Sequence, residues 1–462
     1  MKPTLEIIIL AAGKGSRMRS SLPKVLHPLG GRPLLAHVLE TVASLNHSGI
    51  HAVIGHGADQ VRSAFDSADS SDFPFPGPNW VLQERQLGTG HAVQQALPAV
   101  KADAVLVLCG DVPLVRRETL GRMAALADAE TLIVLTLNTD RPEGFGRIVR
   151  GPDGGIEAIV EDRDTSPEQR RIGEVNSGIM LLPAARLRRW LGRLDRDNAQ
   201  GEYYLTDVVA MARAEGSPVR ALSIDDSREV QGVNDLAQLA ALERHYQMGK
   251  AEQLLAAGAR LADPARVDVR GEVATGKNVE IDVNVVFEGK VSLGEGVRVG
   301  PNCVVKDASI AAGTELLAGT CVDGAVIGAD CRIGPMARLR PGTELGERVK
   351  IGNFVETKNA RLGNGAKANH LCYLGDVEIG ENANIGAGVI VCNYDGAKKH
   401  QTVIGNRVFV GSNSVLIAPL RLRDDAFVAA GSAINSEVPG GNLAVGRARQ
   451  RNIPRWKRPG GR

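Results

Sequence analysis

The chain has 462 residues, more than one ordinary hydrophobic core accommodates, so two or three domains are expected. Its 55 basic and 53 acidic residues give a formal net charge of +2, and only 3% of the residues are aromatic. A charge so close to zero provides no extended field for nucleic acid or a membrane surface, and so few rings provide no base-stacking platform. Six cysteines without a C-x-x-C pair indicate small core residues in a reducing cytosol, and argue against a disulfide or zinc framework.

The first element expected is a buried strand, Leu5 to Leu10, followed by a glycine-rich loop that extends to Met18. Glycine after a strand lets backbone N–H groups turn toward an anion, and Arg17 and the nearby Lys24 add positive charge. The loop lacks the P-loop pattern, and a plain glycine-rich turn is the alternative. The apolar run is too short to span a bilayer and has no basic leader, so we expect a cytoplasmic protein with no membrane span.

Further apolar stretches at 53–54, 80–82 and 104–108 are separated by helical patterns such as 33–45 and 118–129. Strands that alternate with helices predict an α/β doubly wound (Rossmann-like) sheet. In such sheets ligands bind beyond the carboxyl ends of the strands, so the residues that follow the strands are the candidates for function.

Two of these strand ends carry informative residues. Asp111 comes directly after the strand that ends at Leu108, and the position alone is equally consistent with a metal ligand and with a helix cap. Gln83 and the turn at Gly88-Thr89-Gly90 follow another strand, where amide and backbone groups are suited to hold a base or a ribose.

The stretch 236–255 has apolar residues at helical spacing and predicts a helix that connects two domains. A coiled-coil interaction helix is the alternative, but sustained heptads are absent. We therefore expect a first domain at 1–234, a linker helix at 235–258, a repeat domain at 259–446 and a basic tail at 447–462.

From Val267 to Ile434 an aliphatic residue returns at every sixth position, in three runs separated by changes of phase. A helix would not keep this spacing on one face, and a simple strand would not place glycine or asparagine at fixed offsets. The pattern predicts a left-handed parallel β-helix of hexapeptide repeats. The runs are Val267, Val273, Val279, Val285, Val291, Val297 and Cys303; Ile327, Ile333, Leu339, Leu345 and Ile351; and Ile404, Val410, Leu416, Leu422, Val428 and Ile434.

The repeat is interrupted between 351 and 379 and again at 397–402, where a loop must leave the coil. A lone histidine on such a scaffold is usually a surface residue. His370, however, has Tyr373, Lys358, Arg340 and the pair Asn393-Tyr394 in nearby coils, which favours a chemical site.

Five motifs in the first half, together with the hexapeptide half, resemble one enzyme family over essentially the whole chain. The motifs are Leu10-Ala-Ala-Gly-Lys-Gly-Ser-Arg-Met18, Leu22-Pro-Lys-Val-Leu-His27, Gln86-Leu-Gly-Thr-Gly-His91, Gly110-Asp-Val-Pro-Leu114 and Gly201-Glu-Tyr-Tyr-Leu-Thr-Asp207. The family resembled is the bacterial bifunctional N-acetylglucosamine-1-phosphate uridyltransferase and glucosamine-1-phosphate N-acetyltransferase.

For the first domain the resemblance implies attack by the phosphate of N-acetylglucosamine-1-phosphate on the α-phosphorus of UTP, with release of pyrophosphate. Arg17 and Lys24 would then neutralise charge, and Asp111 and Asn234 would hold Mg²⁺. The residues that the resemblance assigns to UDP-N-acetylglucosamine are Leu10, Ala11, Ala12, Gly13, Lys24, Gln83, Gly88, Thr89, Cys109, Gly110, Gly146, Glu161, Asn176 and Asn234.

For the second domain the resemblance implies an acetyltransferase in which His370 is the general base toward the amine of glucosamine-1-phosphate, with Glu356 orienting the imidazole. It assigns the sugar phosphate to Arg340, Lys358, Tyr373 and Asn384. It assigns acetyl-CoA to Ala387, Asn393, Tyr394, Ser412, Ala430 and Arg447. It also implies a homotrimer.

Two alternatives remain open at this point. In one, only the nucleotidyltransferase is active, and the β-helix is a trimerising or regulatory module. In the other, the chain is a non-enzymatic scaffold or exchange-factor subunit built from the same two folds. The polar cluster around His370 argues against the first, and the combination of Arg17, Lys24 and Asp111 argues against the second. The basic residues of the tail beyond Arg447 are expected to form a solvated, mobile end.

Overall fold

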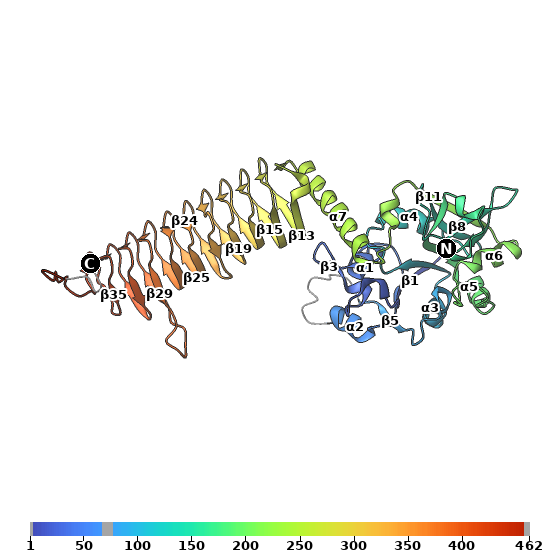
Figure 1. Cartoon of the computed structure of the whole chain (residues 1–462), viewed down its shortest axis with the longest axis horizontal. Coiled ribbons are helices and arrows are strands. Elements are labelled where there is room, and N and C mark those ends of the chain that lie inside the picture. Colours follow the sequence, from blue (N-terminus) through green and yellow to red (C-terminus); the bar gives the residue numbers. More distant parts are fainter. Residues whose placement is uncertain (1–2, 67–76, 457–462) are drawn as a thin grey trace. The chain divides into compact units, whose positions relative to one another are not determined.

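The computed structural model describes residues 3–66 and 77–456, and the chain divides into two compact units, Met1–Tyr246 and Gln247–Arg462 (Figure 1). Lys457, Arg458 and Arg462 of the predicted tail lie outside the described residues. In the part of the chain that the structure describes, no helix combines the length and the apolar character needed to cross a bilayer.

The first unit is built on a nine-stranded sheet in which most strands are parallel; β10 pairs antiparallel with β6, β7 and β8, and β9 pairs antiparallel with β8. Its main path is β11 (Val219–Ile224), β7 (Leu132–Asn138), β10 (Glu174–Pro183), β6 (Ala104–Cys109), β1 (Leu5–Ala11), β4 (Gly49–Ile54) and β5 (Asn79–Leu82), with β8 (Arg147–Arg150) and β9 (Ile156–Val160) off this path. A separate two-stranded ribbon pairs β2 (Pro28–Leu29) with β3 (Arg32–Pro33).

Helices cover both faces of this sheet, as a doubly wound fold requires. Side chains of β1 alternate between two cores: Ile7 and Ile9 pack in one, and Ile8 packs in the other. The first core includes residues of α1 (Leu34–Ala43), α2 (Ala58–Asp66) and α4 (Arg117–Ala125). The second includes residues of α3 (Thr89–Ala96), α5 (Ala184–Leu191) and α6 (Asp207–Ala214).

The parallel strands β6, β1, β4 and β5 end at one common edge. Their register pairs Leu10 with Cys109, Ala11 with Ile54, and Ile54 with Leu82. The glycine loop, Asp111 and Gln83 therefore emerge at the same edge, which is where the chain order predicts a binding site.

Helix α7 (Leu236–Ala256) agrees closely with the helix predicted at 236–255, and the boundary between the two units falls inside it. Within the first unit, the N–H of Gly30 donates to Oε2 of Glu243 at 2.8 Å. Within the second unit, Gln247 exchanges two hydrogen bonds with the backbone of Val269, at 2.6 and 3.1 Å.

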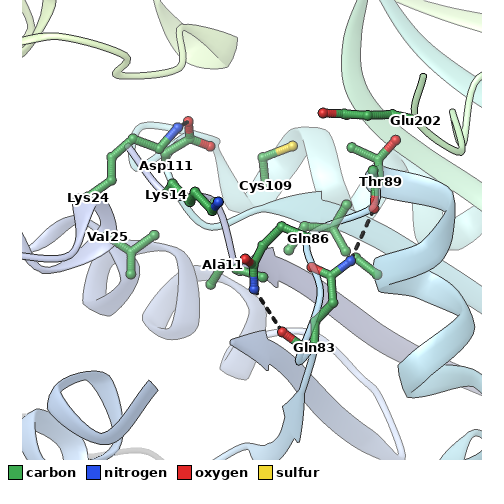
Figure 2. Close-up of a pocket in the computed structure, with 15 residues that line it drawn as sticks. Ala11, Lys14, Lys24, Val25, Gln83, Gln86, Thr89, Cys109, Asp111 and Glu202 are labelled. Atoms are coloured by element: carbon green, nitrogen blue, oxygen red, sulfur yellow. Dashed lines mark hydrogen bonds and ion pairs between the residues drawn. The ribbon is translucent and has the colours of Figure 1, made fainter. Parts of the chain in front are cut away.

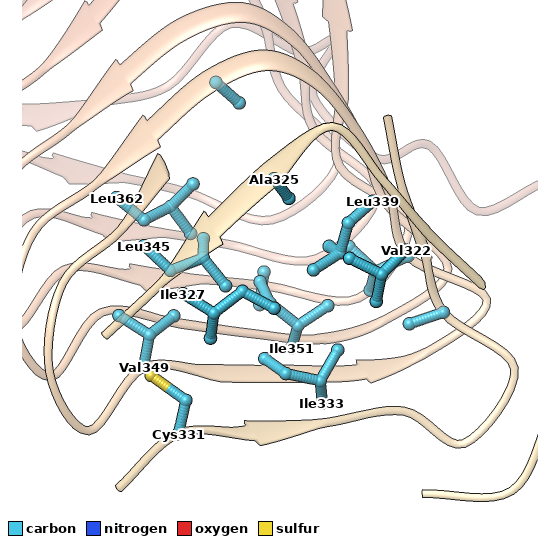
Figure 3. Packing of buried hydrophobic residues seen from close by; sticks show 14 of the residues in the cluster. Val322, Ala325, Ile327, Cys331, Ile333, Leu339, Leu345, Val349, Ile351 and Leu362 are labelled. Carbon is cyan, nitrogen blue, oxygen red and sulfur yellow. The ribbon is translucent and has the colours of Figure 1, made fainter. Parts of the chain in front are cut away.

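The second unit is a parallel β-helix whose paired residues are mostly 17 or 18 positions apart, such as Val304 with Cys321 and Ile333 with Ile351. Three hexads therefore complete one coil. The spacing is 25 where the hairpin is inserted, as between Asn384 and Phe409. Apart from Val273, which is half-buried, every residue of the three predicted hexad runs is buried. Figure 3 shows Ile327, Ile333, Leu345 and Ile351 directed into the same interior, where coil stacks on coil.

Its strands form two long parallel sheets. The first contains β12 (Arg260–Leu261), β14 (Glu280–Ile281), β16 (Arg298–Val299), β18 (Glu315–Leu316), β21 (Arg332–Ile333), β24 (Lys350–Asn353), β26 (Lys367–His370), β28 (Asn384–Ile385), β31 (Phe409–Val410), β34 (Phe427–Val428) and β36 (Leu443–Ala444). The second contains β13 (Val267–Thr275), β15 (Val285–Leu293), β17 (Val304–Ile310), β19 (Cys321–Asp323), β20 (Ala325–Ile327), β22 (Arg338–Leu339), β23 (Thr343–Leu345), β25 (Glu356–Leu362), β27 (Tyr373–Ile379), β29 (Ile390–Cys392), β30 (Thr402–Ile404), β32 (Val415–Ile417), β33 (Leu420–Leu422) and β35 (Ala433–Ile434).

The loop predicted from the second break of the repeat is present. Between β29 and β30 the chain leaves the coil, and the loop projects from the regular ladder in Figure 1. An antiparallel bridge between Tyr394 and Lys399 closes it into a narrow hairpin. The N–H of His400 donates to the carbonyl of Asn393 at 2.8 Å at its base.

Candidate active sites

A cavity of about 470 Å³ opens at the carboxyl edge of the first sheet (Figure 2). Most of the strand-end residues singled out from the sequence line it. The lining consists of Leu10, Ala11, Ala12, Gly13, Lys14, Lys24, Val25, Gln83, Gln86, Gly88, Thr89, Ala92, Cys109, Asp111 and Glu202. Gln86 and Glu202 were not predicted individually, although both lie in motifs that carried the resemblance.

Two cation–oxygen contacts link the glycine loop and the nearby Lys24 to distant segments. The ammonium of Lys24 pairs with the carboxylate of Asp111, and these two side chains face each other in Figure 2. The guanidinium of Arg17 donates to Oδ1 of Asn234 at 3.0 Å. A third contact joins the segment that carries Asp111 to the segment that carries Asn234: the N–H of Val233 donates to the carbonyl of Asp111 at 3.0 Å.

Glycine is required at Gly15 for this arrangement. Its φ of 59° is in the left-handed region, and a Cβ there would lie 2.9 Å from Cβ of Lys24. The loop therefore approaches the backbone that carries Lys24 as closely as glycine allows.

The opposite wall of the cavity is organised by Gln83, whose side chain is 2% exposed. Its amide nitrogen contacts the carbonyl of Gly88 at 3.2 Å and Nδ1 of His91 at 2.9 Å. Gln86 in turn donates to the carbonyl of Gln83 at 2.9 Å (Figure 2). Hydrogen bonds thus hold the polar side chains of this wall in place.

The three residues assigned to the sugar lie together but do not line this cavity. The N–H of Asn176 donates to the carbonyl of Gly146 at 2.8 Å, and a Cβ on Gly146 would lie 3.6 Å from Oε2 of Glu161. Glu161 also accepts a hydrogen bond of 2.9 Å from Thr206. Burial raises the pKa of Glu161, and the Thr206 hydrogen bond opposes that rise.

The donor set around Asp111 and Asn234 fits a magnesium ion. Each presents an oxygen, and each oxygen already faces a cation, Lys24 or Arg17, so the site attracts positive charge. Among the described residues there is no cluster of three or more histidine, cysteine or carboxylate side chains that would form a closed metal cage. Mg²⁺ takes one or two protein oxygens and completes its shell with water and phosphate, so two ligands suffice.

A second group of polar side chains lies on the β-helix where the repeat is interrupted. Arg340 donates to Glu356 at 2.8 Å, and β25 pairs Glu356 with Tyr373 of β27. The hydroxyl of Tyr373 and the amide of Asn393 converge over Gly375, because a Cβ at that position would lie 2.5 and 2.8 Å from them. The structure therefore brings Arg340, Tyr373 and the base of the hairpin together in one place.

Positive charge is concentrated at this group. The neighbouring ammonium of Lys399 lowers the pKa of Lys358. The carboxylate of Asp376 accepts from Asn359 at 2.8 Å and also from Asn393, and the pKa of Asp376 is lowered by these hydrogen bonds although its burial acts in the opposite direction. Lys399 was missed in the sequence, but the break of the repeat marks the hairpin that carries it.

The predicted role of Glu356 is wrong. Glu356 pairs with Arg340, whereas Nδ1 of His370 lies 2.9 Å from Oδ1 of Asn353. The reason is register: Asn353 and His370 are direct partners of β24 and β26, and Glu356 has already turned onto the next face of the coil.

The residues assigned to acetyl-CoA continue the corner on which His370 lies. The carbonyl of Ala387 accepts from Asn413 at 2.7 Å, and that of Ser412 accepts from Gly431 at 2.8 Å, so Ala387, Ser412 and Ala430 are stacked in successive coils. Asn384 belongs to β28 immediately before this corner. Tyr394 is exposed on the hairpin, and Arg447 is exposed directly after the last backbone contacts of the coil at Gly446.

Comparison with known proteins agrees with both halves. The profile of the MobA-like NTP transferase domain matches residues 7–221, that of the GMPPB C-terminal domain matches 269–362, and that of the hexapeptide repeat of succinyl-transferase matches 401–436. Fold and sites together define a nucleotidyltransferase joined to a left-handed β-helix of the hexapeptide acyltransferase class.

Curated relatives extend over the full length. The "Bifunctional protein GlmU" of Marinobacter nauticus is 56% identical over 456 residues, covering 98% of this chain and 99% of the relative. The proteins of the same name from Pseudomonas entomophila and Alkalilimnicola ehrlichii are 54% and 52% identical and cover 99% and 100% of this chain and 98% of each relative. The chain belongs to the GlmU family and is a bifunctional enzyme of UDP-N-acetylglucosamine synthesis, which confirms the resemblance.

Proposed function

We propose that the first-unit cavity joins UTP to N-acetylglucosamine-1-phosphate by positioning and charge neutralisation alone. The sugar phosphate is already an anionic nucleophile, so no general base is required. Lys24 and the glycine loop line the cavity. Together with Arg17, Lys24 and the backbone N–H groups of that loop bind the triphosphate and neutralise the charge that grows as pyrophosphate departs. The geometry of Gln83, Gly88 and Thr89 supports binding of uracil at the opposite wall. Gly146, Glu161 and Asn176 bind the sugar.

The metal of this reaction is Mg²⁺, held by Asp111 and Asn234. When bound, it screens the phosphate oxygens and so favours attack at the α-phosphorus. With Mg²⁺ bound, Lys24 and Arg17, which contact these two oxygens in the structure, would be available for the phosphates themselves. Lys24 and Arg17 would then exchange Asp111 and Asn234 for phosphate oxygens, and the metal would add positive charge around the phosphates.

We further propose that the β-helix site transfers the acetyl group of acetyl-CoA to the 2-amino group of glucosamine-1-phosphate. Arg340, Lys358 and Tyr373 bind the sugar phosphate, and His370 accepts the proton as the amine attacks the thioester. An imidazole is the side chain best suited to accept and release a proton near neutral pH, which fits this role. The stacked corner of Ala387, Ser412 and Ala430 is the acetyl-CoA groove, with Asn393, Tyr394 and Arg447 at its margins.

We propose that the protein assembles as a homotrimer and that it is located in the cytoplasm. Met336, Phe354 and Leu371 occupy equivalent corners of three successive coils, with φ of 52–56°. Their side chains are 54–59% exposed. Apolar side chains held in a strained conformation and turned to solvent are typical of a surface that another chain covers. All six cysteines are free thiols, which a reducing compartment maintains.

The observation that carries the proposal is the pair of separate polar sites, one on each unit, each built from the residues that its own chemistry needs. Two assays on one preparation test it. Pyrophosphate release from UTP, Mg²⁺ and N-acetylglucosamine-1-phosphate is expected to vanish in Asp111→Ala. Thiol release from acetyl-CoA and glucosamine-1-phosphate is expected to vanish in His370→Ala. Pyrophosphate release by Asp111→Ala would refute the proposed role of Asp111, and thiol release by His370→Ala would refute that of His370.

A further inference from the structure

The ring of His370 has one nitrogen held and one free. Nδ1 lies 2.9 Å from Oδ1 of Asn353, and among the described residues Nε2 has no hydrogen-bond partner. An amide oxygen only accepts, so Nδ1 carries the proton and Nε2 carries the lone pair. A general base needs this tautomer, because only the unprotonated nitrogen accepts a proton from the substrate.

The position of Asn353 is fixed by the β-helix itself. Asn353 and His370 are partners in the parallel pair β24 and β26, and the carbonyl of Asn353 accepts from the N–H of Leu371 at 3.0 Å. The carbonyl of His370 accepts from Gly388 at 3.1 Å and from the thiol of Cys372 at 3.0 Å. The two side chains therefore leave adjacent rungs of one ladder, whose spacing is about 4.8 Å.

Asn353 and the residues of the proposed acetyl-CoA groove lie on opposite sides of His370 along the stack of coils. Beyond His370 the next three corner residues are Ala387, Ser412 and Ala430, which leave room on that side of the imidazole. Asn353 is on the other side, away from this groove. An amide there contacts the base and not the incoming thioester.

We infer that Asn353 is the positioning residue of the acetyltransferase site, selecting the Nδ1–H tautomer of His370 and directing Nε2 toward the amine of glucosamine-1-phosphate. The inference rests on the proposed role of His370 as base. Asn353 holds the ring and does not touch the reacting atoms, so its loss lowers kcat while the KM values for both substrates change little.

The test compares Asn353→Leu, which removes the acceptor at similar volume, with Asn353→Asp, which keeps an oxygen there. Positioned base catalysis contributes roughly 10² to 10⁴ in rate, so Asn353→Leu is expected to lower kcat by at least about 10-fold, with KM within about twofold. Asn353→Asp is expected to retain kcat within about fivefold of wild type, because its carboxylate also accepts from Nδ1–H. Pyrophosphate release measured on each preparation reports whether the rest of the chain is intact.

A matched control is Asn302→Ala. Asn302 also accepts a hydrogen bond across coils, from Asn284 at 3.1 Å, but it lies in an earlier coil than the polar group. Acetyl transfer is expected to be unchanged in this variant. A loss there equal to that of Asn353→Leu would mean that any cross-coil asparagine acts through stability alone, and would overturn the inference.

¹⁵N spectra of histidine-labelled enzyme give a readout that a merely structural role would not change. The wild type is expected to show Nδ1–H for His370, and Asn353→Leu a shift toward Nε2–H. Wild-type kcat in Asn353→Leu, with His370→Ala inactive, would refute the role of Asn353. Activity in His370→Ala would instead refute the proposed base. If Asn353→Leu does not fold, the wild-type spectrum decides, and an Nε2–H signal for His370 overturns the inference.

Discussion

Replacing Gly88 by alanine is a sharp perturbation of the first site. Gly88 opens α3 with φ of 112°, a conformation that favours glycine, and its carbonyl accepts from the side chain of Gln83. A Cβ at this position would lie 2.5 Å from the carbonyl oxygen of Tyr203 and 2.8 Å from its nitrogen. Both of these are backbone atoms, so no flexible side chain can move aside.

The size of the effect follows from these distances. Ordinary van der Waals contact begins at 3.4 Å. The turn and the Tyr203 segment must therefore separate by close to 1 Å, and a misplacement of about 1 Å at a catalytic site costs about 100-fold in rate. We expect Gly88→Ala to lower uridyl transfer by about 100-fold. Acetyl transfer on the same polypeptide should stay within about twofold, because its site lies in the other unit.

Gly154→Ala is the matched control. Gly154 also has a positive φ, of 76°, but nothing lies within 4 Å of a Cβ there. It therefore carries the conformational strain, about 1–2 kcal/mol, without the collision. Pyrophosphate release should remain near wild type in this variant. Full activity in Gly88→Ala, or an equal loss in Gly154→Ala, would refute the reasoning from contact geometry.

Three further predictions concern the first unit. Chelation of divalent metal with EDTA should abolish uridyl transfer and spare acetyl transfer, and Mg²⁺ should restore the lost activity; survival of pyrophosphate release in EDTA would contradict the metal site. Arg147 is 1% exposed and donates hydrogen bonds to the carbonyl of Phe145 and to Asp162, next to Gly146 and Glu161. In steady-state kinetics, Arg147→Met should therefore raise KM for N-acetylglucosamine-1-phosphate by about 10-fold or more, while KM for UTP stays constant. Burial, with nearby Asp195 and Asp164, raises the pKa of Asp207 to about 6, so its contribution to stability is present below about pH 4 and is lost as the pH rises through about 6. Asp207→Asn should therefore raise the unfolding temperature more at pH 7.5 than at pH 4, and an equal shift at both would argue against this.

The repeat domain could be predicted from the sequence because its signal is local and periodic. A residue such as Ile333 or Leu339 is buried by the coils on either side of it, and the six-residue spacing predicts which residues face the interior. Val273 is the exception: it is half-buried, although Val267 and Val269 of the same strand β13 are buried.

The strand-end residues of the first unit could also be predicted, because parallel strands end at one edge whatever the details of packing. Gly146, Glu161 and Asn176 could not be placed in this way. They are brought together by β8, β9 and β10, whose antiparallel pairing has no local signal in the sequence. Only the resemblance to a family identified them.

Asn353 was missed and Glu356 was wrongly chosen for the same physical reason. An asparagine at a corner of a β-helix resembles any turn asparagine, and a carboxylate appears the better partner for an imidazole. Register decides between them: Asn353 precedes His370 by 17 residues, one coil, whereas Glu356 lies on the next face. Counting coils from the histidine would have identified the correct residue.

The most direct test of two separate sites on one chain is product analysis of a single mixture. Wild-type enzyme with glucosamine-1-phosphate, acetyl-CoA, UTP and Mg²⁺ should yield UDP-N-acetylglucosamine. Asp111→Ala should stop at N-acetylglucosamine-1-phosphate, and His370→Ala should form product only when N-acetylglucosamine-1-phosphate is supplied. Loss of both steps in either single variant, with the fold intact, would contradict the separation of the two sites.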